Sequence, residues 1–267
     1  MKNILVLMHD DAGQEARFQA ALDLTRALDG HLTCIDVSIA PAFVGDYGVT
    51  GGEALLMADE QLREKNNRAH MEARLQAEDV AYDWADACGF LDQCVRDAAA
   101  LADVIVLNRE LDTIHYPDMR ELVGQLVLKS GKPILAVPEA IRRFDAAGHA
   151  IIAWDGSDEA NAAMRAAVPL LTKASKVTLL EVDDGSIRIP AEQAAEYLSR
   201  HGIKPVVERT SSAIDLPSTI IADRLEETKA SYLVMGGFGH SRFSEALFGG
   251  VSRRMLSECL VPIFMAH

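Results

Sequence analysis

Short apolar runs alternate with amphipathic segments along the whole chain. The runs at 3–8 and 150–154 are apolar almost throughout, which is typical of strands buried on both faces of a parallel sheet. Apolar residues then recur at helical spacing over 20–28 after the first run, and over 164–171 after the second. The pattern therefore predicts strands that alternate with amphipathic helices.

The apolar runs of the first half recur in the second half in the same order. Residues 32–37 (LTCIDV) correspond to residues 177–182 (VTLLEV), position for position. Two later pairs of runs follow the same order: 102–107 with 230–235, and 132–137 with 261–266. Ordered matches of this kind indicate an internal duplication with a period far too long for a solenoid.

Each half has the predicted order of a doubly wound α/β unit, with further strands near 80–86 and 203–209. We predict two Rossmann-like doubly wound parallel-sheet domains in tandem, over residues 1–138 and 149–267. A charged helix is expected near 53–78 in the first domain, and its charges most simply form a solvent-exposed face. The glycine-rich loop before it could also act as a mobile flap.

Composition and charge narrow the classes of partner. The 267 residues are 49% hydrophobic and 25% charged, which is ordinary for a globular protein, and the net charge is −14. Such a chain repels nucleic-acid backbones and anionic lipid at long range, so we expect neither nucleic acid nor a membrane as a partner. No apolar stretch approaches 18 residues and no signal-peptide core is present, so we expect a cytoplasmic location.

Cysteine and histidine patterns predict no metal site. Cys34, Cys88, Cys94 and Cys259 lack zinc-ligand spacing and most simply are small buried hydrophobic residues. The segment His9-Asp10-Asp11 follows the first strand and could coordinate a metal ion, but a solvated loop or a helix cap explains it more simply.

Glycines gather after the fourth strand of the second domain. Residues 236–242 (GGFGHSR) follow that strand, and residues 249–252 (GGVS) begin a predicted helix. Arg242 stands where a dinucleotide fingerprint needs its third glycine, and the chain contains no GK[ST] for a Walker-type loop. What remains is the spacing Gly-x2-Gly-x9-Gly.

This glycine spacing suits a phosphate site. Glycine lets the main chain approach a ligand closely, and the amides of Gly250, Val251 and Ser252 could hold an anion at the helix start. Arg242 and His240 beside the loop are candidate phosphate partners, although a plain surface histidine is the simpler interpretation of His240. Two tight turns that need glycine would produce the same pattern.

An acidic residue follows the first strand of the second domain, at the same predicted sheet edge. Asp155 in the sequence Asp155-Gly156-Ser157 could accept hydrogen bonds from ribose hydroxyls. Alternatively, Asp155 or Ser157 caps the following helix.

These residues resemble the universal stress protein family in its tandem two-domain form. The family motif G-x2-G-x9-G-[ST] is matched by Gly236, Gly239 and Gly249, but Gly250 replaces its final Ser or Thr. The resemblance implies a Rossmann-like domain that binds ATP or AMP, with or without Mg²⁺. The binding residues that it implies are Asp155, Gly156, Val182, Met235, Gly236, Gly239, His240, Arg242, Gly249, Gly250, Val251 and Ser252.

Within this resemblance, Val182 corresponds to the family's main-chain contact to adenine. The hydroxyl that the family motif places at position 250 is missing, which predicts weaker binding of triphosphate, and Ser252 is the candidate to compensate. A hydrogen bond to a charged group contributes about 1.5–3 kcal/mol, so its loss would weaken binding without abolishing it.

The first domain departs further from the family motif. His9 stands in the place of Asp155, and the sequence NREL at 108–111 replaces GGFG at 236–239. Glu110 would add negative charge beside a phosphate, and Leu111 would block a close approach. We predict that this domain does not bind ATP in the same way. Tandem family members form an internal pseudo-dimer through their last strands, so its expected role is to pair with the second domain.

The expected function is that of a nucleotide-responsive stress protein. ATP or AMP would bind in the second domain and alter contacts to an unidentified protein partner. No HExxH, GxSxG or nucleophile–base pair occurs, so we expect no enzyme, although slow hydrolysis of bound ATP stays open. The alternative is a scaffold, or a protein for another small ligand, with degenerate sites. Assembly of the pseudo-dimer into a homodimer also stays open.

Overall fold

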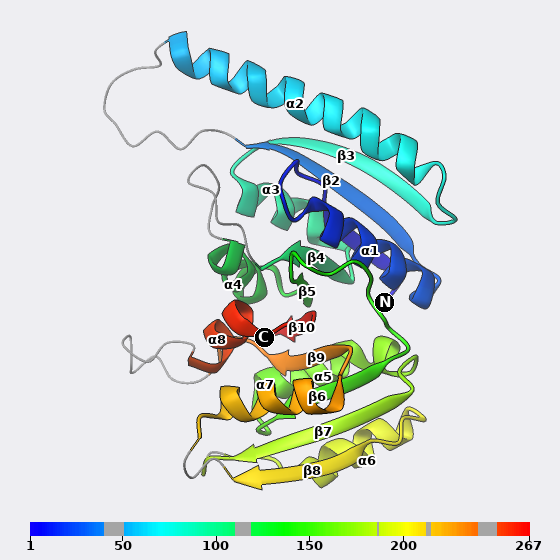
Figure 1. Ribbon diagram of the computed structural model, residues 1–267, viewed down its shortest axis with the longest axis vertical. Coiled ribbons are helices and arrows are strands. Elements are labelled where there is room, and N and C mark those ends of the chain that lie inside the picture. The colour runs from blue at the N-terminus through cyan, green and yellow to red at the C-terminus, as the bar shows by residue number, and fades with distance from the viewer. Residues whose placement is uncertain (40–50, 110–118, 186, 212–214, 240–249) are drawn as a thin grey trace.

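The computed structural model describes residues 1–39, 51–109, 119–185, 187–211, 215–239 and 250–267 (Figure 1). Their strands form one ten-stranded sheet in the order β3-β2-β1-β4-β5-β10-β9-β6-β7-β8. The strands of the first half are β1 (Asn3–Leu7), β2 (His31–Ile39), β3 (Ala81–Gly89), β4 (Val104–Asn108) and β5 (Ile134–Val137). Those of the second half are β6 (His149–Trp154), β7 (Lys176–Asp183), β8 (Val206–Ser211), β9 (Tyr232–Gly236) and β10 (Ile263–Ala266).

Helices cover both faces of the sheet. One face packs against α1 (Gln14–Leu28), α2 (Gly51–Leu75), α5 (Asp158–Leu171) and α6 (Ala191–Arg200). The other packs against α3 (Leu91–Ala98) with the short 3-10 helix Ala99–Leu101, α4 (Met119–Ser130), α7 (Pro217–Thr228) and α8 (Gly250–Glu258). Side chains of β1 alternate between the two faces, because Ile4 and Val6 join one core cluster while Leu5 and Leu7 join the other. This arrangement confirms the predicted doubly wound α/β fold.

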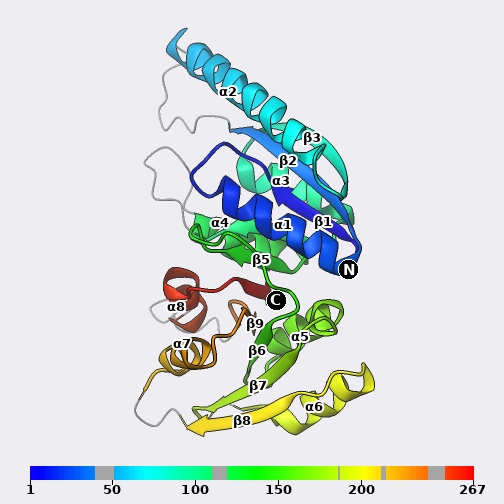
Figure 2. The ribbon, with the colours of Figure 1, turned by 45° about the vertical axis from the view of Figure 1, so that its right-hand side comes forward.

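The two halves meet at β5 and β10, which lie at the junction in both views (Figures 1 and 2). These two strands pair antiparallel, with Leu135 opposite Phe264, whereas the neighbouring pairs within each half are parallel. The predicted tandem arrangement with an internal pseudo-dimer is therefore confirmed. β5 ends at Val137 and β6 begins at His149, so the predicted linker contains no helix or strand. The domain boundaries themselves stay a prediction.

Burial in α2 and at the cysteines differs in part from expectation. The charged helix α2 has the expected solvent-exposed face, which includes Asp59 and Lys65, but Glu64 on its other face is 2% exposed, and Met71 and Leu75 pack into the core. Cys34 and Cys259 are buried as expected, whereas Cys88 is exposed and Cys94 is half-buried. Cys88 is exposed because it lies on β3, an edge strand many of whose side chains face solvent. Within the described residues, no helix combines the length and the apolar character that crossing a membrane requires.

Candidate functional site

The carboxyl ends of three neighbouring strands bring the predicted site residues together. β6 lies between β7 and β9, with Trp154 at its end opposite Glu181 on β7. Asp155 follows β6 directly, Val182 is the penultimate residue of β7, and Gly236 ends β9. The structure therefore places the acid, the proposed adenine contact and the first motif glycine at one edge of the sheet, where parallel α/β sheets bind ligands. Met235, one residue earlier on β9, is buried.

Gly156 has a conformation that only glycine adopts easily. Its φ is +70°, and a Cβ there would lie 2.1 Å from the main-chain nitrogen of Ile189. The indole of Trp154 donates to the carbonyl of Ile189 at 2.8 Å, and the amide of Arg188 donates to the carbonyl of Asp155 at 3.1 Å. The segment that follows β7 therefore packs over the end of β6, a contact that no sequence motif predicts.

Both roles suggested for the segment after β6 are compatible with its geometry. Ser157 is the N-cap of α5, because its hydroxyl accepts from the amide of Ala160 at 3.1 Å. Asp155 Oδ1 accepts from the amide of Ser157 at 2.9 Å. Asp155 Oδ2 makes no hydrogen bond within the described residues and is available to a ligand.

Gly236 and Gly239 are needed for space rather than for a turn. Neither has a positive φ. A Cβ on Gly236 would lie 2.6 Å from the amide nitrogen of Ala160, and a Cβ on Gly239 would lie 2.5 Å from the carboxylate carbon of Glu159. The first turn of α5 thus lies directly against the glycine loop. At these two positions close approach, rather than a positive φ, accounts for the glycines. The second of the two turns that would need glycine, at Gly249, lies outside the described residues.

Glu159 is a residue that the motif analysis missed. Its carboxylate lies against Gly239, so it brings a negative charge to the loop that is predicted to hold phosphate. The signal was its place in the first turn of the helix that follows Asp155. A phosphate next to Gly239 requires either a movement of this side chain or a cation between the two negative charges.

The start of α8 offers an open position at its first residue. A Cβ on Gly250 would meet no atom of the described residues within 4 Å, which leaves room beside them for a larger side chain. Val251 is half-buried, whereas Ser252 is buried and its hydroxyl accepts from the amide of Phe238 at 3.1 Å. Ser252 therefore ties α8 to the glycine loop. Three further predicted site residues lie outside the described residues: His240, Arg242 and Gly249.

The glycine loop also contacts the first half. Phe238 has a φ of +57°, and a Cβ on Gly124 of α4 would lie 2.9 Å from Cζ of its ring. A Cβ on Gly237 would lie 3.0 Å from a methyl group of Val127, also on α4. The candidate site is therefore continuous with the junction between the two halves.

The equivalent edge of the first half holds a buried polar cluster instead. His9, Asp36 and Glu64 are 1%, 3% and 2% exposed, and His9 Nδ1 lies 2.8 Å from Glu64 Oε1. The expectation that His9 belongs to a solvated loop or a helix cap was wrong, because α2 covers this loop and contributes Glu64. Asn67 on the same helix donates to the carbonyl of Met8 at 2.9 Å.

Burial and neighbouring charge shift two carboxyl groups of this cluster in opposite directions. Burial raises the pKa of Asp36 to about 9, and the negative charge of Glu64 adds to the rise. Burial also opposes ionisation of Glu64, but the hydrogen bond and the charge of His9 lower the pKa of Glu64 overall. Asp36 is therefore the proton-carrying carboxyl group of the pair.

A buried arginine occupies the space beside β4 in the first half. Arg17 is fully buried and pairs with Asp11 at 2.8 Å. It also donates to the side-chain oxygen of Asn108 at 2.5 Å and to the carbonyl of Leu7 at 2.8 Å. These side chains occupy the position at the sheet edge where the second half has its glycine loop. Of the residues expected to obstruct a nucleotide here, Glu110 and Leu111 lie outside the described residues.

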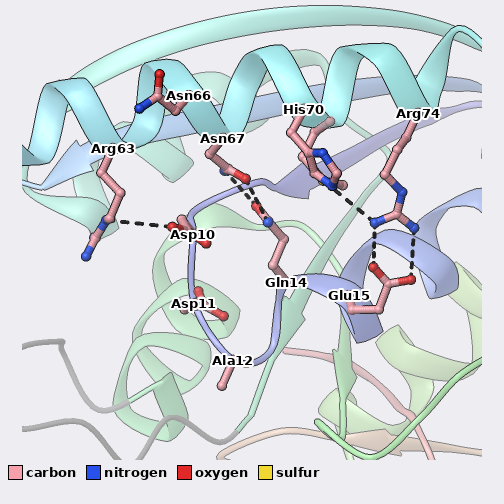
Figure 3. A pocket seen from close by; sticks show the side chains of 11 residues that line it. Asp10, Asp11, Ala12, Gln14, Glu15, Arg63, Asn66, Asn67, His70 and Arg74 are labelled. Carbon is pink, nitrogen blue, oxygen red and sulfur yellow. Dashed lines mark hydrogen bonds and ion pairs between the residues drawn. The ribbon is translucent and has the colours of Figure 1, made fainter.

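A cavity of about 490 Å³ opens between α2 and the loop after β1 (Figure 3). Asp10 and Arg63 lie on its two sides, 3.9 Å apart, and Arg74 forms an ion pair with Glu15 at 2.6 Å. Nine of the eleven residues that line it are polar or charged. The first half therefore has a recess of its own, different in position and chemistry from the candidate site of the second half.

Sequence and structure comparisons relate the chain to one family. Residues 148–267 match the sequence model described as the universal stress protein family. This part of the chain is therefore similar to universal stress protein domains. "Universal stress protein Slr1230" of Synechocystis sp. is 22% identical over 293 residues, which cover 98% of this chain and 99% of that relative. The resemblance to the tandem form of universal stress proteins is therefore confirmed.

Solved universal stress proteins share the fold over the whole chain. One from Archaeoglobus fulgidus has a TM-score of 0.74 at 14% identity and covers 98% of this chain and 97% of its own. A putative universal stress protein from Pseudomonas aeruginosa has a TM-score of 0.57 at 15% identity and covers 100% of this chain and 93% of its own. At these identities the structural matches show the fold alone.

Proposed function

We propose that the second half binds an adenine nucleotide, ATP or AMP, at the carboxyl ends of β6, β7 and β9. The observation that carries this proposal is the convergence of Asp155, Val182 and the Gly236–Gly239 loop at one sheet edge, next to the start of α8. The function is binding rather than catalysis, because we assign no general base or nucleophile to this edge.

Each part of this edge suits one part of a nucleotide. Asp155 Oδ2 is an acceptor for a ribose hydroxyl, and the main chain at Val182 is the contact that the family resemblance assigns to adenine. The amides of Gly250 and Val251 begin a helix of nine residues, whose dipole favours an anion at that end. The open space beside Gly250 leaves room for phosphate oxygens.

Glu159 makes Mg²⁺ part of the proposal for ATP. A hard divalent cation bridges carboxylate and phosphate oxygens, which removes the repulsion between Glu159 and the phosphates. AMP carries less negative charge and depends less on such a cation. We therefore expect Mg²⁺ to strengthen the binding of ATP more than the binding of AMP, and expect Glu159→Gln to reduce this difference.

The junction between the two halves could transmit nucleotide binding to a surface that contacts a partner protein. Phe238 connects the glycine loop to α4 of the first half through its contact with Gly124. A nucleotide that repositions the loop would move Phe238, and the surface around α4 and α8 would change with it. This is the route by which we expect nucleotide binding to alter the contacts of the protein with a partner.

The proposal is tested by releasing and identifying any bound nucleotide, and by adding nucleotide to the purified protein. Denatured protein should release adenine nucleotide into the supernatant, or Mg-ATP should raise the melting temperature. A ligand at 100 times its Kd stabilises a protein by about 2.7 kcal/mol, which a thermal melt detects. Asp155→Asn should reduce the shift, whereas Asp158→Asn, an exposed acid three residues later, should not. Absence of both nucleotide and shift would contradict the proposal.

The second candidate function is a scaffold that binds no nucleotide. Gly250 in place of Ser or Thr, and the carboxylate of Glu159 at the loop, favour it. It predicts melting curves that Mg-ATP and AMP leave unchanged, together with a fold that Gly239→Val disturbs only locally.

A further inference from the structure

Three buried side chains of the first half form a group with the composition of a metal site. His9 lies in the loop after β1, Asp36 on β2, and Glu64 on α2. Each offers one ligand atom, and these three atoms all lie within 4.8 Å of one another. We propose that His9, Asp36 and Glu64 bind one divalent transition-metal ion, and that Zn²⁺ fits this donor set best.

The donor set favours zinc over harder cations. One imidazole nitrogen and two carboxylate oxygens are ligands that Zn²⁺ binds at about 2.0–2.2 Å, usually with four-coordinate geometry. Mg²⁺ and Ca²⁺ prefer oxygen ligands alone and keep several waters, for which a site that is at least 97% buried offers little room.

An independent observation points to a bound cation. Oδ1 of Asp36 is buried and has no hydrogen-bond partner within the described residues. A buried carboxyl oxygen without a partner is costly, and two ionised carboxylates side by side would repel each other. A divalent cation that replaces the proton of Asp36 would supply the missing partner and offset this repulsion.

The surroundings hold the ligands in place. The amide of Asp10 and the side chain of Asn67 each donate to the Glu64 carboxylate at 3.3 Å, which orients it. Glu60 lies one helical turn before Glu64, with Oε1 4.0 Å from His9 Nδ1, but it is paired with Arg63 at 2.7 Å and lies outside the group of three.

The cavity of Figure 3 supplies an entry path. Asp10, Arg63 and Asn67 line this cavity and also contact Glu64, which places the cluster next to its wall. A metal site needs such a path, because ions reach buried ligands through openings of this kind.

The experiment uses the full chain, dialysed against a chelator and titrated with Zn²⁺ by calorimetry. We expect about one equivalent per chain, and Asp36→Asn should weaken binding by at least tenfold. The matched control is Asp83→Asn on neighbouring β3, which removes an exposed acid paired with His31 at 2.8 Å and should leave binding unchanged.

Two further measurements keep the result decisive. Asp36→Asn replaces a buried carboxyl group by an amide of the same shape, so the metal-free variant should melt no lower than wild type. Titration with Co²⁺ should give a visible spectrum without a thiolate charge-transfer band, which separates this site from Cys88 and Cys94. No binding, a thiolate band, or equal affinity of Asp36→Asn and wild type would overturn the proposal. In those cases Asp36 carries a proton and the cluster is structural only.

Discussion

The side chain of Asn108 fills the space directly beside Gly13. A Cβ on Gly13 would lie 2.4 Å from Cγ of Asn108, so the end of β4 and the start of α1 meet without room for a further atom. In the second half the arrangement is reversed, with Gly236 at the strand end and Glu159 at the helix start. Each half therefore has one glycine at this contact, at the helix start in the first half and at the strand end in the second.

Strand register shows that the two strand ends are equivalent. Leu5 lies opposite Ile105 in the first half, and Ile151 lies opposite Leu233 in the second. Counting forward along β4 and β9 makes Asn108 equivalent to Gly236. Gly13, the N-cap of α1, and Glu159, in the first turn of α5, are the helix-start residues that contact these strand ends. The strand end of the first half therefore carries a side chain, bound to a buried arginine, where the second half has a bare main chain. This difference is the physical basis for expecting a nucleotide in one half only.

The contact between Asn108 and Gly13 predicts an energetic coupling. Gly13→Ala should destabilise the wild-type protein by about 1–3 kcal/mol through overpacking, since the φ of −88° at Gly13 suits alanine. In an Asn108→Gly background the same change should cost at least about 1 kcal/mol less. Denaturant unfolding of the four proteins in this cycle measures the coupling. Equal costs in both backgrounds would show that the contact is absent.

Restoring a hydroxyl at position 250 should strengthen ATP binding. A serine Cβ there meets no atom of the described residues within 4 Å. A hydroxyl bonded to phosphate contributes about 1.5–3 kcal/mol, which is roughly tenfold or more in affinity. Calorimetric titration with Mg-ATP compares Gly250→Ser with wild type. Gly250→Ala is the control, because it adds the carbon without the hydroxyl. If alanine and serine act alike, position 250 does not contact the phosphates.

Phe238→Ala should loosen the junction between the halves. The ring packs against Gly124 of α4 and is half-buried, so we expect a loss of about 1–3 kcal/mol in the free energy of unfolding. Phe90→Ala removes an exposed ring and should change stability by less than about 0.5 kcal/mol. Denaturant unfolding of both variants tests this contact, and similar small effects would argue against it.

Asp36 should make the metal-free protein less stable as pH rises. Its pKa is raised to about 9 by burial in the folded chain, while an unfolded aspartate has a pKa of about 3.9. Between these two pKa values, the folded protein keeps a proton on Asp36 that the unfolded chain has released. The stability that this proton contributes is fully present below the pKa of the unfolded state and is lost as the pH rises through the pKa of the folded state. Glu64, Asp86 and Arg68 are the charged groups that act on it.

Asp36→Asn removes this titration, so its stability relative to wild type should increase with pH. Denaturant unfolding between about pH 5 and about pH 8.5 measures the difference. Two stability curves that stay parallel across this window would show that Asp36 does not carry the buried proton.

The sequence was informative wherever periodicity reflects burial. The run at 3–8 became β1 (Asn3–Leu7), and the run at 150–154 became β6 (His149–Trp154), because fully buried strands must be apolar on both faces. Because the two halves share the same order of apolar runs, a strand predicted in one half also predicted its counterpart in the other. The edge at which Asp155 and Gly236 meet also followed, since the carboxyl ends of parallel strands share one edge.

Contacts between residues distant in sequence could not be predicted in this way. Nothing in the local pattern links Phe238 to Gly124, or Asn108 to Gly13, because such contacts depend on how finished elements pack. Glu64 did leave a signal. It lies three residues before Asn67 and seven before Met71, on one helical face of α2 that is buried. Treating all charges of that helix as solvent-exposed obscured this face.

We propose that one half of the chain has kept a nucleotide site and that the other has not. The stoichiometry of Mg-ATP binding to the chain, measured by calorimetry, tests this proposal, with Gly239→Val as the variant that drives a side chain into Glu159. We expect one equivalent of ATP per chain, and none for Gly239→Val. Two equivalents, or one equivalent that Gly239→Val leaves intact, would contradict it.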